Sequence, residues 1–146
     1  MSARLWVVVV AVVFTVISGR LRAADTSIVL VVNDSVKIEQ ISIDSLRAIY
    51  SLRQLSWLDG VEITAFVLDI DGGAHRQFCR DLLKVYPHQL KKGWDRMAYT
   101  GRARVPQVVQ SEQMLLDLVK QIPGAIGYVL RDFDVPNVHM VSVLEE

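Results

Sequence analysis

The stretch from Val61 to Leu83 constrains the fold most, because a predicted strand, a glycine loop and a predicted helix follow one another directly. Residues 61–68 are largely apolar and predict a strand, residues 69–73 predict a tight loop, and residues 74–83 predict a helix. The first amides of a helix have no intrahelical partner and lie at the positive end of the helix dipole. Gly72 and Gly73 would let a ligand or another backbone segment come close. This arrangement therefore predicts an anion site.

Two acidic residues beside the same helix start oppose that interpretation. Asp69 and Asp71 would repel a bound anion. Arg76, on the first turn, could hold an oxyanion through its guanidinium group, although it also fits an ordinary surface arginine. The candidate binding residues are Gly72, Gly73, Ala74, His75 and Arg76.

The rest of the chain alternates predicted strands and helices, which indicates a single small α/β layered domain. Residues 27–32 form a continuous apolar run typical of a strand buried on both faces, and further strands are predicted at 126–130 and 138–144. Helices are predicted after the capping residues Ser42 and Ser111 and from Pro87. Helical spacing, together with the loop at 51–60, predicts these inward-facing residues: Ile43, Leu46, Ile49, Tyr50, Trp57, Leu58, Phe78, Cys79, Leu82, Leu83, Tyr86, Leu90, Trp94, Met97, Met114, Leu115, Leu118, Val119 and Ile122.

An apolar run from Leu5 to Ile17 follows Arg4 near the N-terminus. It has the length of a signal-peptide core and is short for a membrane span of about 20 residues. We therefore expect residues 1–23 to be a signal peptide and residues 24–146 to be the exported domain; an uncleaved membrane anchor is the alternative. Cleavage would leave 13 basic and 16 acidic residues, a net charge of −3. That balance gives no electrostatic reason to expect nucleic-acid binding.

The segment from Val67 to Gly72 also allows an enzymatic interpretation. An apolar strand followed by Asp-x-Asp-Gly resembles the first motif of haloacid-dehalogenase-type phosphatases, in which Asp69 would be the nucleophile and Asp71 the acid/base beside Mg²⁺. Asp132 and Asp134 could then supply further metal ligands. The same loop does not fit an EF-hand, because Arg80 occupies the position of the closing glutamate.

His75 and Cys79 stand four residues apart, so they share one face of the predicted helix. Such a pair could act as two ligands of a metal ion. No second pair of ligands is evident in the sequence, and Cys79, the only cysteine, lies in the apolar stripe. We therefore interpret Cys79 as a core residue and predict neither a metal nor a cofactor.

Several stretches, in order along most of the chain, resemble the short, PstS-like phosphate ABC transporter substrate-binding proteins of the type II periplasmic-binding-protein superfamily. The most specific is Pro-Gly-Ala-Ile-Gly-Tyr-Val at 123–129. The others are the helix at 43–53, Trp-Leu-Asp-Gly at 57–60, Arg-Gln-Phe at 76–78, and Trp94 followed by Tyr-Thr-Gly-Arg at 99–102.

The resemblance implies the fold of one lobe of a type II periplasmic binding protein. It also implies phosphate or a related oxyanion held at a Ser-Gly-Thr helix start. Here Gly72 stands in place of the serine and Ala74 in place of the threonine, and the arginine that precedes the motif in full-length members falls at Leu68. Both hydroxyl donors and one cation are therefore missing.

Two functions from different classes follow from this resemblance. The first is an exported, periplasmic solute-binding module, not an enzyme, that binds an oxyanion weakly. The second is a periplasmic interaction or accessory domain that has lost its ligand and contacts an envelope protein.

Overall fold

The structure is a computed structural model that describes residues 27–131 and 138–145. Its elements follow in the order β1 (Ile28–Val32), β2 (Gln40–Ser42), α1 (Ile43–Tyr50), β3 (Thr64–Leu68), α2 (Gly73–Phe78), η1 (Cys79–Leu83), α3 (Pro87–Thr100), β4 (Gln107–Val109), α4 (Glu112–Gln121), β5 (Ala125–Leu130) and β6 (His139–Leu144). The segment η1 is a short π-helix that continues α2. The predicted α/β layered domain is confirmed.

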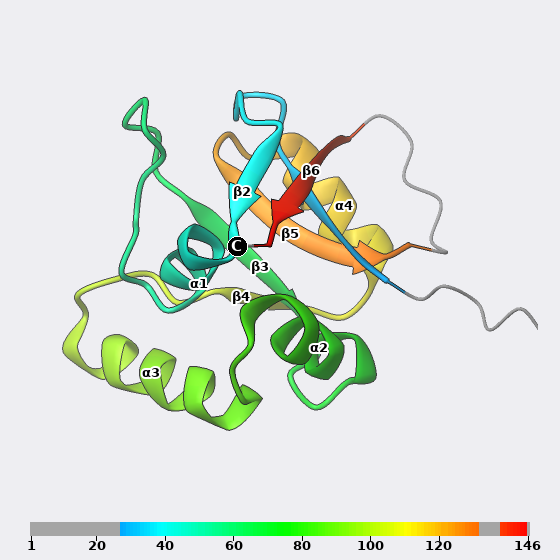
Figure 1. Cartoon of the computed structure of the whole chain (residues 1–146). Coiled ribbons are helices and arrows are strands. Elements are labelled where there is room, and N and C mark those ends of the chain that lie inside the picture. The colour runs from blue at the N-terminus through cyan, green and yellow to red at the C-terminus, as the bar shows by residue number, and fades with distance from the viewer. Residues whose placement is uncertain (1–26, 132–137, 146) are drawn as a thin grey trace, which may run out of the picture.

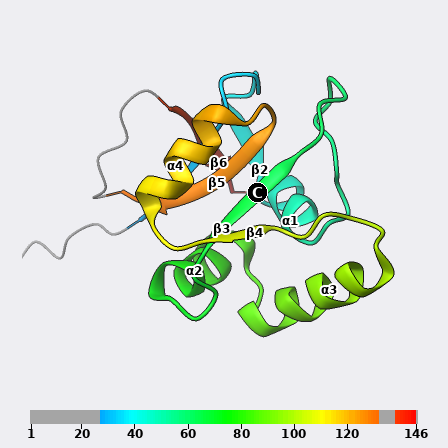
Figure 2. The ribbon, with the colours of Figure 1, turned by 180° about the vertical axis from the view of Figure 1, so that it is seen from behind.

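The strands form one sheet in the order β2-β6-β1-β5-β3-β4. Strand β1 pairs antiparallel with β5 and β6, whereas β3 pairs in parallel with β4 and β5 and β2 pairs in parallel with β6. Helices α1 and α2 lie on one face of the sheet (Figure 1). Helix α4 covers the other face over β5 (Figure 2). The central strands are therefore buried on both sides, as the apolar run at 27–32 predicts.

Helix α3 lies at the outer end of the domain, beyond α1 and α2 (Figures 1 and 2). Pro87 occupies its first turn, and Gly101 ends it with φ +64°. Its inward side buries Leu90 and Trp94, and the indole Nε1 of Trp94 donates to the carbonyl of Tyr50 at 2.7 Å. One face of α3 is thus anchored to the body of the domain.

Two glycines near the fifth strand are required by close packing. Gly124 has φ +77°, and a Cβ there would lie 2.1 Å from the carbonyl oxygen of Glu62. A Cβ on Gly127 would lie 2.6 Å from Leu115, so α4 can pack on β5 only without one. The most specific stretch of the family resemblance is therefore also a packing junction.

Three residues expected to face inward are exposed, so those predictions are wrong. Tyr86 is 68% exposed because the helix ends at Lys84, which has φ +54°, so the helical spacing does not continue to Tyr86, the N-cap of α3. Leu58 is fully exposed at the tip of a turn, and Met114 on the first turn of α4 is half-exposed while Leu116 is buried in its place. The predicted strand at 61–68 begins only at Thr64, because residues 57–61 form a turn closed by the Trp57 amide and the Val61 carbonyl.

Candidate oxyanion site at the start of the second helix

The third strand ends in a loop that is held by its own backbone. The carbonyl of Asp69 accepts from the amide of Gly72 at 2.9 Å, and the carboxylate of Asp69 accepts from the amide of Asp71 at 3.1 Å. A short aspartate side chain favours such a turn because it can satisfy a backbone amide two residues on. The loop therefore holds the Asp69 carboxylate beside the start of α2.

The backbone at the start of α2 has the form of an anion cradle. Gly72 is the N-cap with φ −76° and ψ 157°, and it contributes no capping side chain. The first intrahelical bond runs from the amide of Arg76 to the carbonyl of Gly72 at 3.2 Å, so the amides of Gly73, Ala74 and His75 have no acceptor within the helix. The structure thus brings together the backbone of these sequence-predicted residues.

The side chains of the candidate site point in different directions. Arg76 is exposed, and its Nη1 donates to the carbonyl of Asp71 at 2.6 Å, which folds the guanidinium back over the loop. The side chain of His75 is fully buried. Of these two residues, only Arg76 can offer a charged side chain at the surface, while His75 can contribute its amide.

The buried imidazole of His75 belongs to a polar network inside the core. The hydroxyl oxygen of Tyr128 accepts from the amide of Leu68 at 3.1 Å and lies 2.8 Å from Nδ1 of His75. Because that oxygen already accepts from an amide, the hydroxyl proton is free to go to Nδ1, and Nε2 then carries the proton that faces the sulfur of Cys79 at 3.5 Å. The network ties α2 to β3 and β5 directly beneath the loop.

Burial sets the ionisation of this network. Desolvation lowers the pKa of His75 below its usual value, while the nearby Asp69 carboxylate acts in the opposite direction and is the smaller influence. Burial also raises the pKa of the Cys79 thiol to about 11. The core therefore holds a neutral imidazole and a protonated thiol, and neither group is presented to a ligand.

The alternative interpretations gain no support from the geometry. His75 and Cys79 do face one another, but no group of three or more His, Cys, Asp or Glu side chains in the described part of the chain could hold a metal ion. The Asp69 carboxylate, the candidate phosphatase nucleophile, is engaged by the loop amide. Asp132 and Asp134 lie outside the described residues.

A recess that the sequence did not predict lies next to the candidate site. Arg76, Arg80, Lys84 and Tyr86 are among the residues that line this pocket of about 550 Å³, which extends to the first turn of α3. Arg76, Arg80 and Lys84 are spaced four residues apart, and this spacing could have indicated a shared basic surface. The π-helical turn at Cys79–Leu83 could not be foreseen from the sequence.

The comparisons with known proteins match the fold. No protein-family model matches the chain, and no curated protein matches it. Among solved structures, PstS from Borrelia burgdorferi matches with a TM-score of 0.64 and 18% identity, over 80% of this chain and 47% of that one. An ABC-type phosphate transport receptor from Vibrio cholerae matches with a TM-score of 0.62 and 17% identity, over 80% and 45%.

The chain thus spans less than half the length of these receptors. No helix among the described residues is long and apolar enough to cross a membrane, and the run from Leu5 to Ile17 lies outside them. The six-stranded mixed sheet with helices on both faces is the fold of one lobe of the PstS-like periplasmic binding proteins.

Proposed function

We propose that this chain is an exported, periplasmic solute-binding module, without catalytic activity, that holds phosphate or a related small oxyanion weakly at the start of α2. One observation carries the proposal: the amides of Gly73, Ala74 and His75 remain available at the end of β3 while the side chains that would strengthen the site are absent. Amides at a helix start attract an anion without any side-chain charge.

The affinity follows from what is missing around that cradle. Neither Gly72 nor Ala74 carries a hydroxyl group, and Leu68 is apolar where the resemblance places an arginine. Each lost hydrogen bond to a charged ligand costs about 1.5–3 kcal/mol of binding free energy. Three such losses would move a micromolar site beyond the millimolar range. Repulsion from Asp69 and Asp71 acts in the same direction.

Calorimetric titration with inorganic phosphate at neutral pH tests the proposal. We expect a dissociation constant in the millimolar range or above for the unmodified chain, and tighter binding by Asp69→Asn/Asp71→Ser. Asparagine at 69 can still accept from the amide of residue 71, so the loop geometry is preserved while two charges are removed. A matched control, Asp44→Asn/Asp117→Ser, removes the same charge from two exposed helix positions and should leave the affinity unchanged.

Two results would contradict this function. Micromolar binding by the unmodified chain would show that Arg76, or another group, supplies the missing charge. An absence of binding by both chains would favour the second candidate, an accessory domain that contacts an envelope protein. One observation favours that candidate: the amide of Asp71 holds the Asp69 carboxylate beside the start of α2, where its charge would repel an anion.

A further inference from the structure

The charges of the described chain are strongly segregated. Residues 76–104 contain eight Lys or Arg residues and two Asp residues, a net charge of +6. The remaining described residues contain five basic and ten acidic side chains, a net charge of −5. The formal net charge of zero for the whole chain hides this separation. A field of this kind attracts anionic partners to one end of the molecule.

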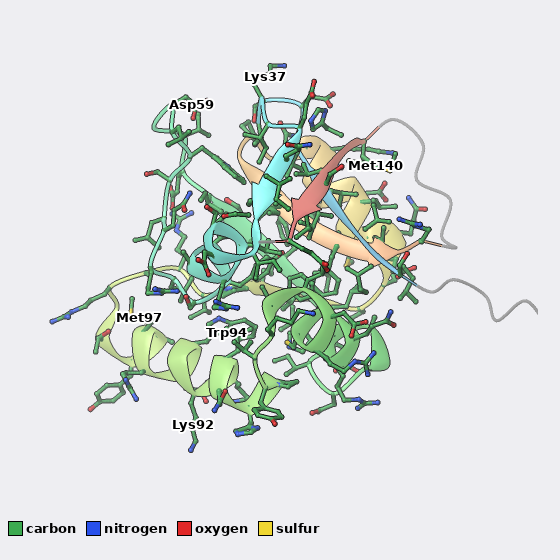
Figure 3. The ribbon with its side chains drawn as sticks, viewed as in Figure 1. Lys37, Asp59, Lys92, Trp94, Met97 and Met140 are labelled. Carbon is green, nitrogen blue, oxygen red and sulfur yellow. The ribbon has the colours of Figure 1, made fainter. Side chains whose placement is uncertain are left out.

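Helix α3 carries part of the positive charge on its outer side. Leu90 and Trp94 face the core, and Lys92 and Arg96, four residues apart, lie on the opposite side of the helix. Both are exposed, and neither forms an ion pair with another described residue. Lys92 points away from the body of the domain, at the end opposite Lys37 (Figure 3). Its positive charge is thus available to a partner.

The pocket beside the start of α3 extends the same surface. Arg80 and Lys84 both line it. Arg80 forms an ion pair with Asp81, with Nε and Oδ1 2.7 Å apart. Tyr86 lines the pocket and stacks on His88, with ring centroids 5.7 Å apart. Since His88 belongs to α3, Tyr86 connects the pocket with the outer side of that helix. A volume of about 550 Å³ leaves room for a phosphate group with organic substituents.

Two exposed tyrosines distinguish this surface from a purely ionic one. Tyr86, before α3, is 68% exposed, and Tyr99, in its last turn, is 93% exposed. Tyrosine is enriched where a membrane meets water, because its ring is apolar and its hydroxyl is polar. Lys and Arg near a bilayer surface add electrostatic attraction to anionic lipids.

We propose that η1 and α3 dock the protein onto an anionic phospholipid surface. The contact is formed by Arg80, Lys84, Tyr86, Lys92, Arg96 and Tyr99, which we call the basic face. The pocket receives a lipid phosphate between Arg80 and Lys84, and the tyrosines rest at the level of the headgroups. The pocket adjoins the oxyanion site, because Arg76 lines it too. The lipid contact uses other residues, however, and does not depend on the proposed function.

Vesicle co-sedimentation of the full chain tests the contact. Vesicles of neutral phosphatidylcholine are compared with vesicles that contain phosphatidylglycerol, at low and at high salt. Any binding through the N-terminal apolar run contributes to both, so the readout is the increase that phosphatidylglycerol causes. We expect a clear increase that high salt removes. Lys92→Glu/Arg96→Glu should reduce it at least about tenfold, because two attractive charges become repulsive.

The matched control is Lys37→Glu/Lys120→Glu, which changes the net charge by the same amount. Lys37 lies at the end of the molecule opposite Lys92 (Figure 3). Lys120 is exposed in α4, outside η1 and α3. We expect this variant to retain the increase. An equal loss in both variants would overturn the proposal, because net charge alone would then explain binding. Equal binding to both vesicle types, or binding of the chain to soluble heparin without any phosphatidylglycerol effect, would also overturn it.

Discussion

The inner side and the outer end of α2 differ in burial and in hydrogen bonding. The inner side buries His75 and Phe78 completely, and the His75 imidazole has two polar neighbours, Tyr128 of β5 and Cys79 of η1. The outer end presents helix amides without acceptors, next to an acidic loop. Core packing limits what the inner side can accept, whereas the outer end can change its ligand chemistry with little effect on stability. The fold therefore constrains the inner side of α2 more strongly than its outer end.

Removal of the central aromatic residue on the inner side should have the largest effect. Phe78 is fully buried, stacks on Tyr128 with ring centroids 3.9 Å apart, and meets Tyr50 edge-on at 4.9 Å. We expect Phe78→Ala to lower the free energy of unfolding by about 3–5 kcal/mol in chemical denaturation. Tyr86→Ala removes an aromatic residue from the exposed surface nearby and should change it by less than about 0.5 kcal/mol. Similar losses in the two variants would show that the contrast between core and surface is false.

The buried network should give the next largest effect. Tyr128→Phe keeps the ring but removes the hydroxyl that pairs with the Leu68 amide and the His75 imidazole. Each buried group left without a partner costs about 1–3 kcal/mol. We therefore expect a measurable loss of unfolding free energy, and Tyr99→Phe, at an exposed position, serves as the control. An unchanged stability in Tyr128→Phe would mean that the network contributes nothing to holding α2 in place.

The pH dependence of stability tests the same network. Because burial lowers the pKa of His75 in the folded state, the unfolded chain takes up a proton first as the pH falls. Stability from this group is complete above about pH 6.5 and decreases below it, by at most about 1.4 kcal/mol per pH unit for one proton. His75→Gln should remove that part of the slope, as measured by urea denaturation between pH 7 and pH 5. A slope that remains unchanged in the variant would assign the effect to other groups.

Local sequence patterns predicted most of the strands and helices that form the core. The continuous apolar run at 27–32 and the caps at Ser42 and Ser111 gave the correct elements. The helix predicted at 74–83 is confirmed, but its second half, Cys79–Leu83, is π-helical. Strands β2 and β4 were missed, because three residues are too few to show a period, and each forms by pairing with a strand distant in the sequence.

The candidate site was predictable only as backbone. The loop and the helix start lie where the glycines indicated, but the inward direction of His75 depends on Tyr128, which is 53 residues away. The basic pocket depends on a π-helical turn that no residue pattern announced. The directions of these side chains thus depend on tertiary contacts, which local sequence patterns do not reveal.

The smallest effect on stability should come from the outer end, where the function is expected to change most. Gly72 is the N-cap of α2, and its φ of −76° suits any residue. A Cβ at this position would lie 3.0 Å from the Asp69 carbonyl oxygen, so the loop must shift slightly to accept a side chain. Serine is preferred over glycine as an N-cap by only a few tenths of a kcal/mol. Gly72→Ser should therefore change the unfolding free energy very little.

The same substitution adds a hydroxyl group beside the amides of Gly73 and Ala74, where the family resemblance places one. We expect tighter phosphate binding by calorimetry, by about tenfold or more, because one hydrogen bond to a charged ligand is worth about 1.5–3 kcal/mol. Gly93→Ser is the matched control: it makes the same change in α3, where a Cβ meets nothing within 4 Å. If Gly72→Ser altered stability strongly and affinity not at all, the start of α2 would be part of the structural core, and the division between a constrained inner side and an adaptable outer end would be wrong.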